Sequence, residues 1–141
     1  MAAAAAHAVC KEILSNDLVS KVKTSGEVFQ SQLQTLMQDH PHVGDIRGRG
    51  FFRGVEIVQD KIAKAPFKRE CQIAPRLKKI AFDLGLVCYP MPGTRDGKSG
   101  DHVLLAPPFI ATEDQLQWVA ETLLTAIDEA CNTAAAAARN N

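Results

Sequence analysis

The stretch from Val43 to Val58 constrains the fold more than any other part of the sequence. Its β-branched and aromatic residues are interrupted by four glycines, a composition typical of short strands joined by a tight connection. Glycine allows positive φ angles and close backbone approach, which a turn or a bulge requires. We therefore expect two strands that meet at Gly48–Gly50, and hence a fold that contains a sheet.

Helical periodicity dominates most of the remaining chain. Apolar residues recur at helical spacing in four segments, which are Ala2–Leu14, Asp17–Met37, Cys71–Leu84 and the segment from Thr112 to Ala130. Asp17 is a suitable cap for the second helix, and Thr112 with Gln115 forms a capping box at the start of the last. Pro41 and Gly85 stand where the second and third helices are expected to end.

Two further short strands are expected in the C-terminal half of the chain, at Leu86–Tyr89 and at His102–Ala106. Pro107-Pro108 stops the second strand, and the polar segment Gln59–Glu70 is expected to be a surface loop. The order α-α-β-β-α-β-β-α predicts the α+β class, with a small, mostly antiparallel sheet covered by helices.

Composition excludes several classes of function. Lys and Arg together number 16, as do Asp and Glu, so no net charge would attract nucleic acid or an anionic membrane. No apolar run approaches the ~20 residues that span a bilayer. The four cysteines are dispersed without metal-site spacing, which favours a reducing compartment. We expect a cytoplasmic protein without a metal, although a mitochondrial location stays open for the full-length form.

Several segments resemble class III pyridoxal-phosphate-dependent aminotransferases of fold type I, in the family's own order. They are Val43–Val58, Gly85–Pro90, Gly93–Gly97 and Gly100–Ile110, the last followed by Thr112-Glu113. Residues 2–14 are similar to the long helix that follows the cofactor-phosphate loop in these enzymes. The resemblance covers nearly the whole chain apart from the tail, and it implies the C-terminal small domain, roughly the final third of a full-length relative.

The resemblance also implies a division of the chain. Residues 1–38 would be a helical segment that links to a missing large domain, and residues 39–132 would form the aminotransferase small domain. The alanine-rich residues 133–141 are expected to be a disordered tail.

The activity implied by the resemblance is transamination, in which an amino group moves between an amine or amino acid and a keto acid or aldehyde. The cofactor of the family, pyridoxal 5′-phosphate, is held as a Schiff base on a lysine and needs an acidic residue at its pyridine nitrogen. In the family both residues lie in the large domain. We therefore assign no catalytic and no cofactor-binding residue here, and we expect the chain alone to bind no cofactor and to be inactive.

The small domain of the family contributes to the substrate pocket through a carboxylate-binding arginine. In some relatives this arginine stands where this sequence has Tyr89, and in others where it has Leu104. Both departures put recognition of ordinary amino acids and keto acids in doubt. Arg95, in the adjacent loop, is the nearby arginine that could substitute. We therefore expect Tyr89 and Arg95 to be substrate-binding residues.

The implied partners are a large pyridoxal-phosphate-binding domain or a full-length homologous subunit, and a small amine or keto acid in the complete enzyme. A second hypothesis is a non-catalytic truncated paralogue that binds or dimerises with a full-length aminotransferase. A third is a gene-model fragment without a function of its own.

Two specific functional interpretations, RNA binding and metal binding, are less well supported than structural roles for the same residues. The glycine-rich strand segment carries three arginines, Arg47, Arg49 and Arg53. An RNA-binding strand would need a basic surface, which zero net charge does not supply, so a structural role for these arginines is favoured. Asp96, Asp101 and His102 could be imagined as metal ligands, but local hydrogen bonds in a glycine-rich turn explain them more simply.

Overall fold

The computed structural model describes the backbone of residues 2–139 and the side chains of residues 2–134. Its elements in chain order are α1 (Ala2–Ser15), α2 (Leu18–Met37), β1 (Val43–Arg49), β2 (Phe52–Ile57), a short 3-10 turn (Arg69–Cys71), α3 (Ile73–Asp83), β3 (Tyr89–Pro92), β4 (Asp101–Leu105) and α4 (Glu113–Arg139). The predicted order of helices and strands and the α+β class are confirmed. Within the described residues, no helix combines the length and the apolar character needed to cross a membrane.

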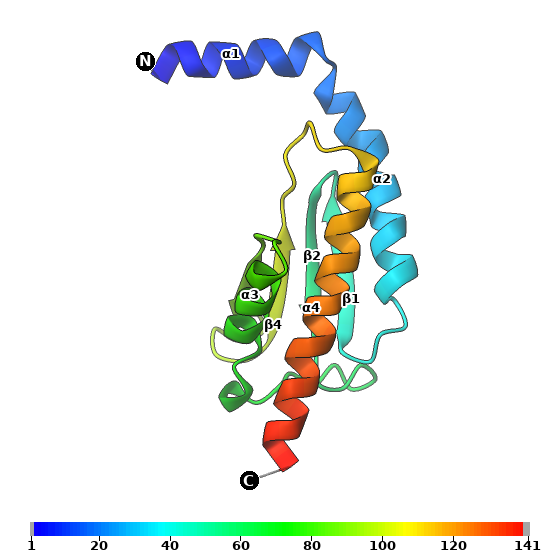
Figure 1. Cartoon of the computed structure of the whole chain (residues 1–141), viewed down its shortest axis with the longest axis vertical. Helices are drawn as coiled ribbons and strands as arrows, with labels where there is room; N and C mark the ends of the chain where they lie inside the picture. The colour runs from blue at the N-terminus through cyan, green and yellow to red at the C-terminus, as the bar shows by residue number, and fades with distance from the viewer. Residues whose placement is uncertain (1, 140–141) are drawn as a thin grey trace.

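The strands form one antiparallel sheet in the order β1-β2-β4-β3. Figure 1 shows α2, α4 and α3 side by side over one face of this sheet. The opposite face carries no helix in the described part of the chain, and we call it the open face. Strand alternation places on it Asp45, Arg47, Arg49, Phe52, Gly54, Glu56, Tyr89, Met91, His102 and Leu104.

The core lies between the sheet and the three covering helices. Its fully buried side chains include Phe29, Leu33 and Met37 of α2, Leu77 of α3, Leu116, Leu123 and Ile127 of α4, and Val55, Ile57 and Val103 of the sheet. Phe29 meets Phe51 edge to face, with ring centroids 6.4 Å apart and an interplanar angle of 84°. This aromatic pair fixes α2 to the β1–β2 hairpin.

The β1–β2 hairpin approaches α2 very closely at two glycines. A Cβ atom on Gly26 would lie 2.6 Å from the Cα of Gly50, which itself adopts a φ of 56° in the turn. The guanidinium of the buried Arg53 crosses the same contact and donates hydrogen bonds to the carbonyls of Gly48 (2.9 Å) and Gly26 (2.6 Å). The predicted turn at Gly48–Gly50 is thus confirmed, and α2 packs directly against it.

The predicted strand at Leu86–Tyr89 is wrong in its position, because β3 begins only at Tyr89. The N–H of Leu86 donates to the carbonyl of Ala81 (2.8 Å) and that of Gly85 to Phe82 (2.9 Å), the pattern of a Schellman helix end. This hydrogen bonding turns the side chain of Leu86 into the core. Residues 86–88 therefore follow the end of α3 and do not pair with β4.

The other helix ends follow the prediction in part. The Thr112–Gln115 capping box forms, with Gln115 Oε1 accepting from the Thr112 N–H (3.0 Å) and Thr112 Oγ1 accepting from the Gln115 N–H (3.3 Å). Asp17 precedes α2 at a φ of 45°, but its side chain makes no capping bond to the helix and accepts instead from Ser20 Oγ (2.9 Å).

Helix α4 does not end before the predicted disordered tail, because it continues to Arg139. Alanine has the highest helix propensity of all residues, so the alanine-rich sequence extends the helix rather than ending it. Ala134 is still buried, with an exposed fraction of 1%. Residues 140 and 141 of the predicted tail lie outside the described residues.

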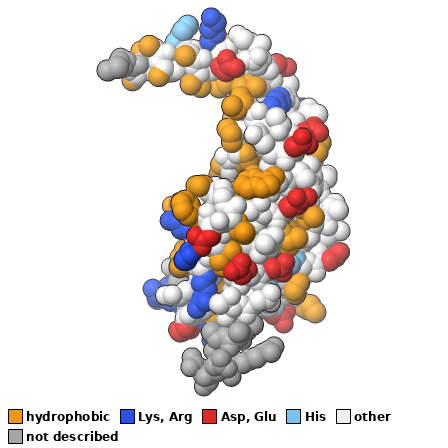
Figure 2. Space-filling model, in the orientation of Figure 1, with side chains coloured by type: hydrophobic (Ala, Val, Ile, Leu, Met, Phe, Trp, Pro, Cys, Tyr) orange, Lys and Arg blue, Asp and Glu red, His pale blue; other side chains and the backbone are white. Residues whose placement is uncertain are grey.

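Helix α1 projects away from the rest of the molecule (Figure 1). None of its residues is buried, and Val9 and Leu14 are exposed by 59% and 80%. Figure 2 shows a hollow between α1 and the body, with hydrophobic side chains on the side of α1 that faces it. Packing within the described chain therefore does not stabilise α1, since most helical stability in proteins comes from burial of an apolar face.

Candidate functional site

The open face of the sheet brings together the two positions at which an arginine was expected by resemblance. Tyr89 of β3 lies opposite Leu104 of β4 in the strand register, and Leu104 in turn lies opposite Gly54 of β2. The Tyr89 side chain is exposed by 58%. One row across the open face, Arg47–Gly54–Leu104–Tyr89, therefore presents a guanidinium, a gap, an apolar side chain and a phenol.

Arg95, the second predicted substrate-binding residue, lies in the turn that joins β3 to β4 and is exposed. Its backbone N–H donates to the carbonyl of Ser99 at 3.0 Å. Tyr89 starts β3 and this turn follows its other end, so the strand separates the two backbones by about 10 Å or more. The structure thus places the turn that carries Arg95 near a second row of the open face, Asp45–Glu56–His102–Met91, and not beside Tyr89.

The two carboxylates of this second row, Asp45 and Glu56, are both paired with Arg47 of the first row. Nη1 of Arg47 lies 2.7 Å from Oδ2 of Asp45 and 3.7 Å from Oε2 of Glu56. The hydrogen bond from Arg47 lowers the pKa of the Asp45 carboxyl group. Because two carboxylates already surround its guanidinium, Arg47 is not a free anion-binding group.

His102 ties the turn after β3 to this row. Its Nδ1 atom is 2.5 Å from Oγ1 of Thr94, which directly precedes Arg95. Burial lowers the pKa of His102, and the charge of Arg47 acts in the same direction. The neutral imidazole is therefore favoured at pH 7, and its bond to Thr94 holds the Arg95 turn against the open face.

The three residues considered as metal ligands do not converge. Asp96 Oδ1 accepts from the N–H groups of Lys98 (2.8 Å) and Ser99 (2.6 Å), as expected of turn chemistry. Asp101 lies under the helices and accepts from the N–H of Ala74 at 3.3 Å, whereas its neighbour His102 lies on the open face. No group of three potential ligands that could hold a metal ion occurs among the described residues.

We predict that the buried carboxylate of Asp101 makes stability depend on pH. Burial raises the pKa of Asp101 above its ordinary value of 3.8, while the Ala74 N–H acts in the opposite direction. The native state then binds the proton more tightly than the unfolded chain, so stability falls as pH rises from about 4 through the raised pKa. We expect Asp101→Asn to keep the bond to Ala74, to raise the free energy of unfolding at pH 7 and to flatten its pH profile.

Urea unfolding at pH 4, 5, 6 and 7 measures this effect. Asp39→Asn, which removes a carboxylate from an exposed position, provides the matched control. A steeper profile, or a loss of stability at pH 7 in Asp101→Asn, would show that the carboxylate stabilises the N-terminus of α3 more than its burial costs.

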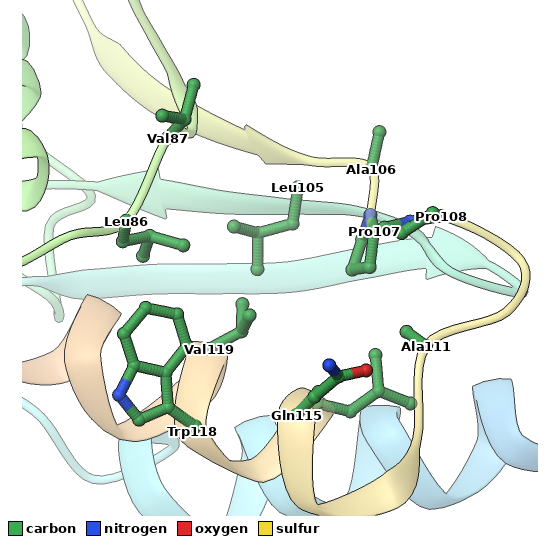
Figure 3. A pocket seen from close by; sticks show the side chains of 11 residues that line it. Leu86, Val87, Leu105, Ala106, Pro107, Pro108, Ala111, Gln115, Trp118 and Val119 are labelled. Atoms are coloured by element: carbon green, nitrogen blue, oxygen red, sulfur yellow. The ribbon is translucent and has the colours of Figure 1, made fainter.

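An apolar cleft of about 340 Å³ opens at one end of β4, and sequence reasoning did not find it. Figure 3 shows Leu105 and Pro107 on one wall and Trp118 of α4 on the other, with Val87 above. The cleft exists because residues 86–88 leave the sheet edge where a strand was predicted. Val87 is exposed by 82% and Trp118 by 46%, so the cleft is open to its surroundings.

The open face of the sheet does not fit pyridoxal phosphate. All four strands lack lysine, and the lysines of the chain lie in helices and loops. The carboxylates of Asp45 and Glu56 on the open face are paired with Arg47. An imine-forming amine next to a free carboxylate, which this cofactor requires, is therefore missing from the open face.

Comparison with known proteins places this architecture in one family. The model of the aminotransferase class-III family matches residues 1–127. An uncharacterized aminotransferase of Schizosaccharomyces pombe is 42% identical over 87% of this chain and 27% of its own length. An aminotransferase of Gibberella zeae is 37% identical over 88% of the chain and 24% of its own length. The chain thus spans about a quarter of the length of these relatives.

Solved structures agree with the sequence comparison. A transaminase obtained by ancestral reconstruction superposes with a TM-score of 0.84 at 27% identity, over 93% of this chain and 27% of its own. A Vibrio fluvialis aminotransferase solved in its PMP-bound form gives a TM-score of 0.73 at 30% identity, over 85% of this chain and 25% of its own. The resemblance seen in the sequence is confirmed, and the chain belongs to the class-III aminotransferase family.

Proposed function

We propose that this chain supplies the substrate-facing sheet of a class III aminotransferase and is inactive by itself. The observation that carries the proposal is the composition of the open face, which offers recognition groups but no amine that could form an imine. In the complete enzyme, pyridoxal phosphate held by another part of the protein would supply the electron sink for amino transfer. The residues of this chain would bind and orient the substrate.

Tyr89 and Arg95 are the residues that we propose to contact the substrate. The exposed phenol of Tyr89 can donate or accept one hydrogen bond, and the neighbouring Leu104 adds an apolar surface. Arg95 can bind a carboxylate with two parallel hydrogen bonds, and the Thr94–His102 contact limits the freedom of its turn. This combination suits an amine or amino acid whose carboxylate, if present, lies near the Arg95 end of β3.

The isolated chain is predicted to form no specific, stoichiometric imine with pyridoxal phosphate. After incubation with the cofactor and reduction by borohydride, intact-mass measurement should find no single stoichiometric adduct, because the four strands carry no lysine. The full-length relative from Schizosaccharomyces pombe serves as the positive control. A single reduced adduct accompanied by turnover of an amine donor would contradict the proposal.

A chimera tests the positive half of the proposal. In this chimera, the matching stretch of the Schizosaccharomyces pombe relative is replaced by this chain. Amine donors are then added, and conversion of the bound cofactor from its aldehyde form to its amine form is followed by absorbance. We expect the chimera to bind the cofactor and to undergo the first half-reaction. A folded, cofactor-loaded chimera that reacts with none of the donors used by the parent would contradict a substrate-facing role for this chain.

A further inference from the structure

Most of the sheet edge is closed to further pairing. In β3, Pro90 and Pro92 lack N–H groups, and such prolines protect an edge strand. In β1, the carbonyl of Ile46 accepts from Gln30 Nε2 (3.2 Å) and that of Gly48 accepts from Arg53. A strand from another molecule would find few free groups at either of these edges.

Ala106, which directly follows β4, is the exception because its backbone groups are free to pair. The two-residue turn between Arg49 and Phe52 fixes the alternation of the sheet, so residues 102, 104 and 106 direct their N–H and C=O groups toward the β3 side. β3 ends its pairing at Tyr89 opposite Leu104, and the chain before Tyr89 diverges. In the described part of the chain, the N–H and the carbonyl of Ala106 make no hydrogen bond, although the residue is exposed.

The apolar cleft lies directly beside this unpaired backbone. Ala106 lines it together with Leu86, Leu105, Pro107 and Trp118, and no lining residue carries a charge. In Figure 3 the side chain of Ala106 points away from the cleft while Leu105 points into it. An extended peptide could therefore pair with Ala106 and insert an apolar side chain between Leu105 and Trp118. Main-chain pairing combined with a side-chain pocket is how peptides are added to sheets.

We propose that this cleft and the Ala106 backbone form a docking site for an extended apolar segment. The segment would come from the part of a class III aminotransferase that this chain does not match. The length of the unmatched part supports this source. This chain matches 27% of the Schizosaccharomyces pombe relative, and the remaining sequence of that relative is far longer. The uncharged lining favours an aliphatic or aromatic side chain over a charged one. The source of the segment, but not the site itself, rests on the proposed function.

Trp118 is the only tryptophan of the chain and reports on the cleft directly. The probe is the peptide acetyl-Thr-Leu-Val-Leu-Thr-amide, with acetyl-Thr-Asn-Val-Asn-Thr-amide as its polar control. We expect the apolar peptide to shift Trp118 emission to shorter wavelength and to move the amide resonances of Ala106 and Val87. No change with the apolar peptide at millimolar concentration, or an equal change with the polar one, would overturn the docking site.

Two variants separate pairing from simple apolar contact. Ala106→Pro removes the unpaired N–H and keeps every other lining residue of the cleft, and we expect it to weaken binding about fivefold, the effect of one hydrogen bond. Val87→Asp places a charge at the rim and should abolish binding. Both sites are exposed, so circular dichroism should find both variants folded. Undiminished affinity in folded Ala106→Pro would overturn strand pairing.

Ten-residue peptides that cover the unmatched part of the Schizosaccharomyces pombe relative test the source. We expect at least one to compete with the apolar probe and to lose affinity in Ala106→Pro. If the probe binds but no such peptide competes, the aminotransferase source is overturned while the site stands. If a peptide competes but the chimera does not react with amine donors, the result counts against the proposed function alone. The docking site and the proposed function can therefore be tested separately.

Discussion

Gly26→Ala is expected to destabilise the chain by about 2 to 3 kcal/mol, although alanine normally stabilises a helix. In an exposed helix interior the substitution would gain about 1 kcal/mol. Here the new Cβ atom would stand 2.6 Å from the Cα of Gly50 and 2.8 Å from its carbonyl carbon, and backbone cannot move aside as a flexible side chain can. Overpacking of this kind forces shifts that outweigh the gain in helix propensity.

Gly54→Ala is the matched control, because Gly54 lies in the same hairpin but has room. Its Cβ atom would meet Leu104 Cδ2 at 3.7 Å, an ordinary contact, and its φ lies outside the left-handed region. We expect Gly54→Ala to be neutral or to stabilise the chain by up to about 1 kcal/mol. Urea unfolding of both variants measures the difference. Equal stability of the two variants would contradict the close approach of α2 and the hairpin.

The sequence reveals Gly26 only as a weak point of its helix, and the reason for its presence is tertiary. Gly26 meets Gly50 from a different element, and no local pattern encodes that meeting. The same holds for Arg53, a charged residue on the strand face that also carries the buried Val55 and Ile57. Its burial between the carbonyls of Gly48 and Gly26 depends on where α2 crosses the hairpin.

Features with a local cause were predicted well. The capping box at Thr112, the glycine-rich turn and the Schellman end at Gly85 each depend on a few neighbouring residues. The strand at Leu86–Tyr89 was misplaced because its prediction also relied on local propensity alone. Its apolar residues satisfy strand propensity, but the hydrogen bond of Leu86 to the end of α3 excludes early pairing with β4.

The candidate site was predicted as a set of residues but not as an arrangement. Resemblance identified Tyr89 and Leu104 as alternative positions of one arginine, and the register of β3 with β4 places the two opposite each other. This neighbourhood explains in physical terms how relatives could place the arginine on either strand and still serve one pocket. The apolar cleft could not be predicted, because it arises from the divergence of residues 86–88 from the sheet.

Tyr89→Arg in the chimera is expected to raise kcat/KM for carboxylate-bearing substrates about 10- to 100-fold relative to amines of the same shape without the carboxylate. A hydrogen-bonded pair with a charged group contributes about 1.5 to 3 kcal/mol, and each 1.4 kcal/mol is tenfold. The position can accept the longer side chain because Tyr89 is exposed by 58% on the open face. Steady-state kinetics with paired substrates, such as an α-amino acid and its decarboxylated amine, measure the ratio.

Leu104→Arg and Arg95→Gln complete this test. Because Leu104 lies opposite Tyr89, an arginine there should change the same ratio in the same direction. Arg95→Gln should lower kcat/KM for carboxylate substrates in the parent chimera, because it removes the guanidinium proposed to bind the carboxylate. A Tyr89→Arg chimera that binds the cofactor but keeps the parent ratio would show that the open face around Tyr89 does not contact the substrate. Loss of selectivity confined to Arg95→Gln would then assign the carboxylate to the turn between β3 and β4.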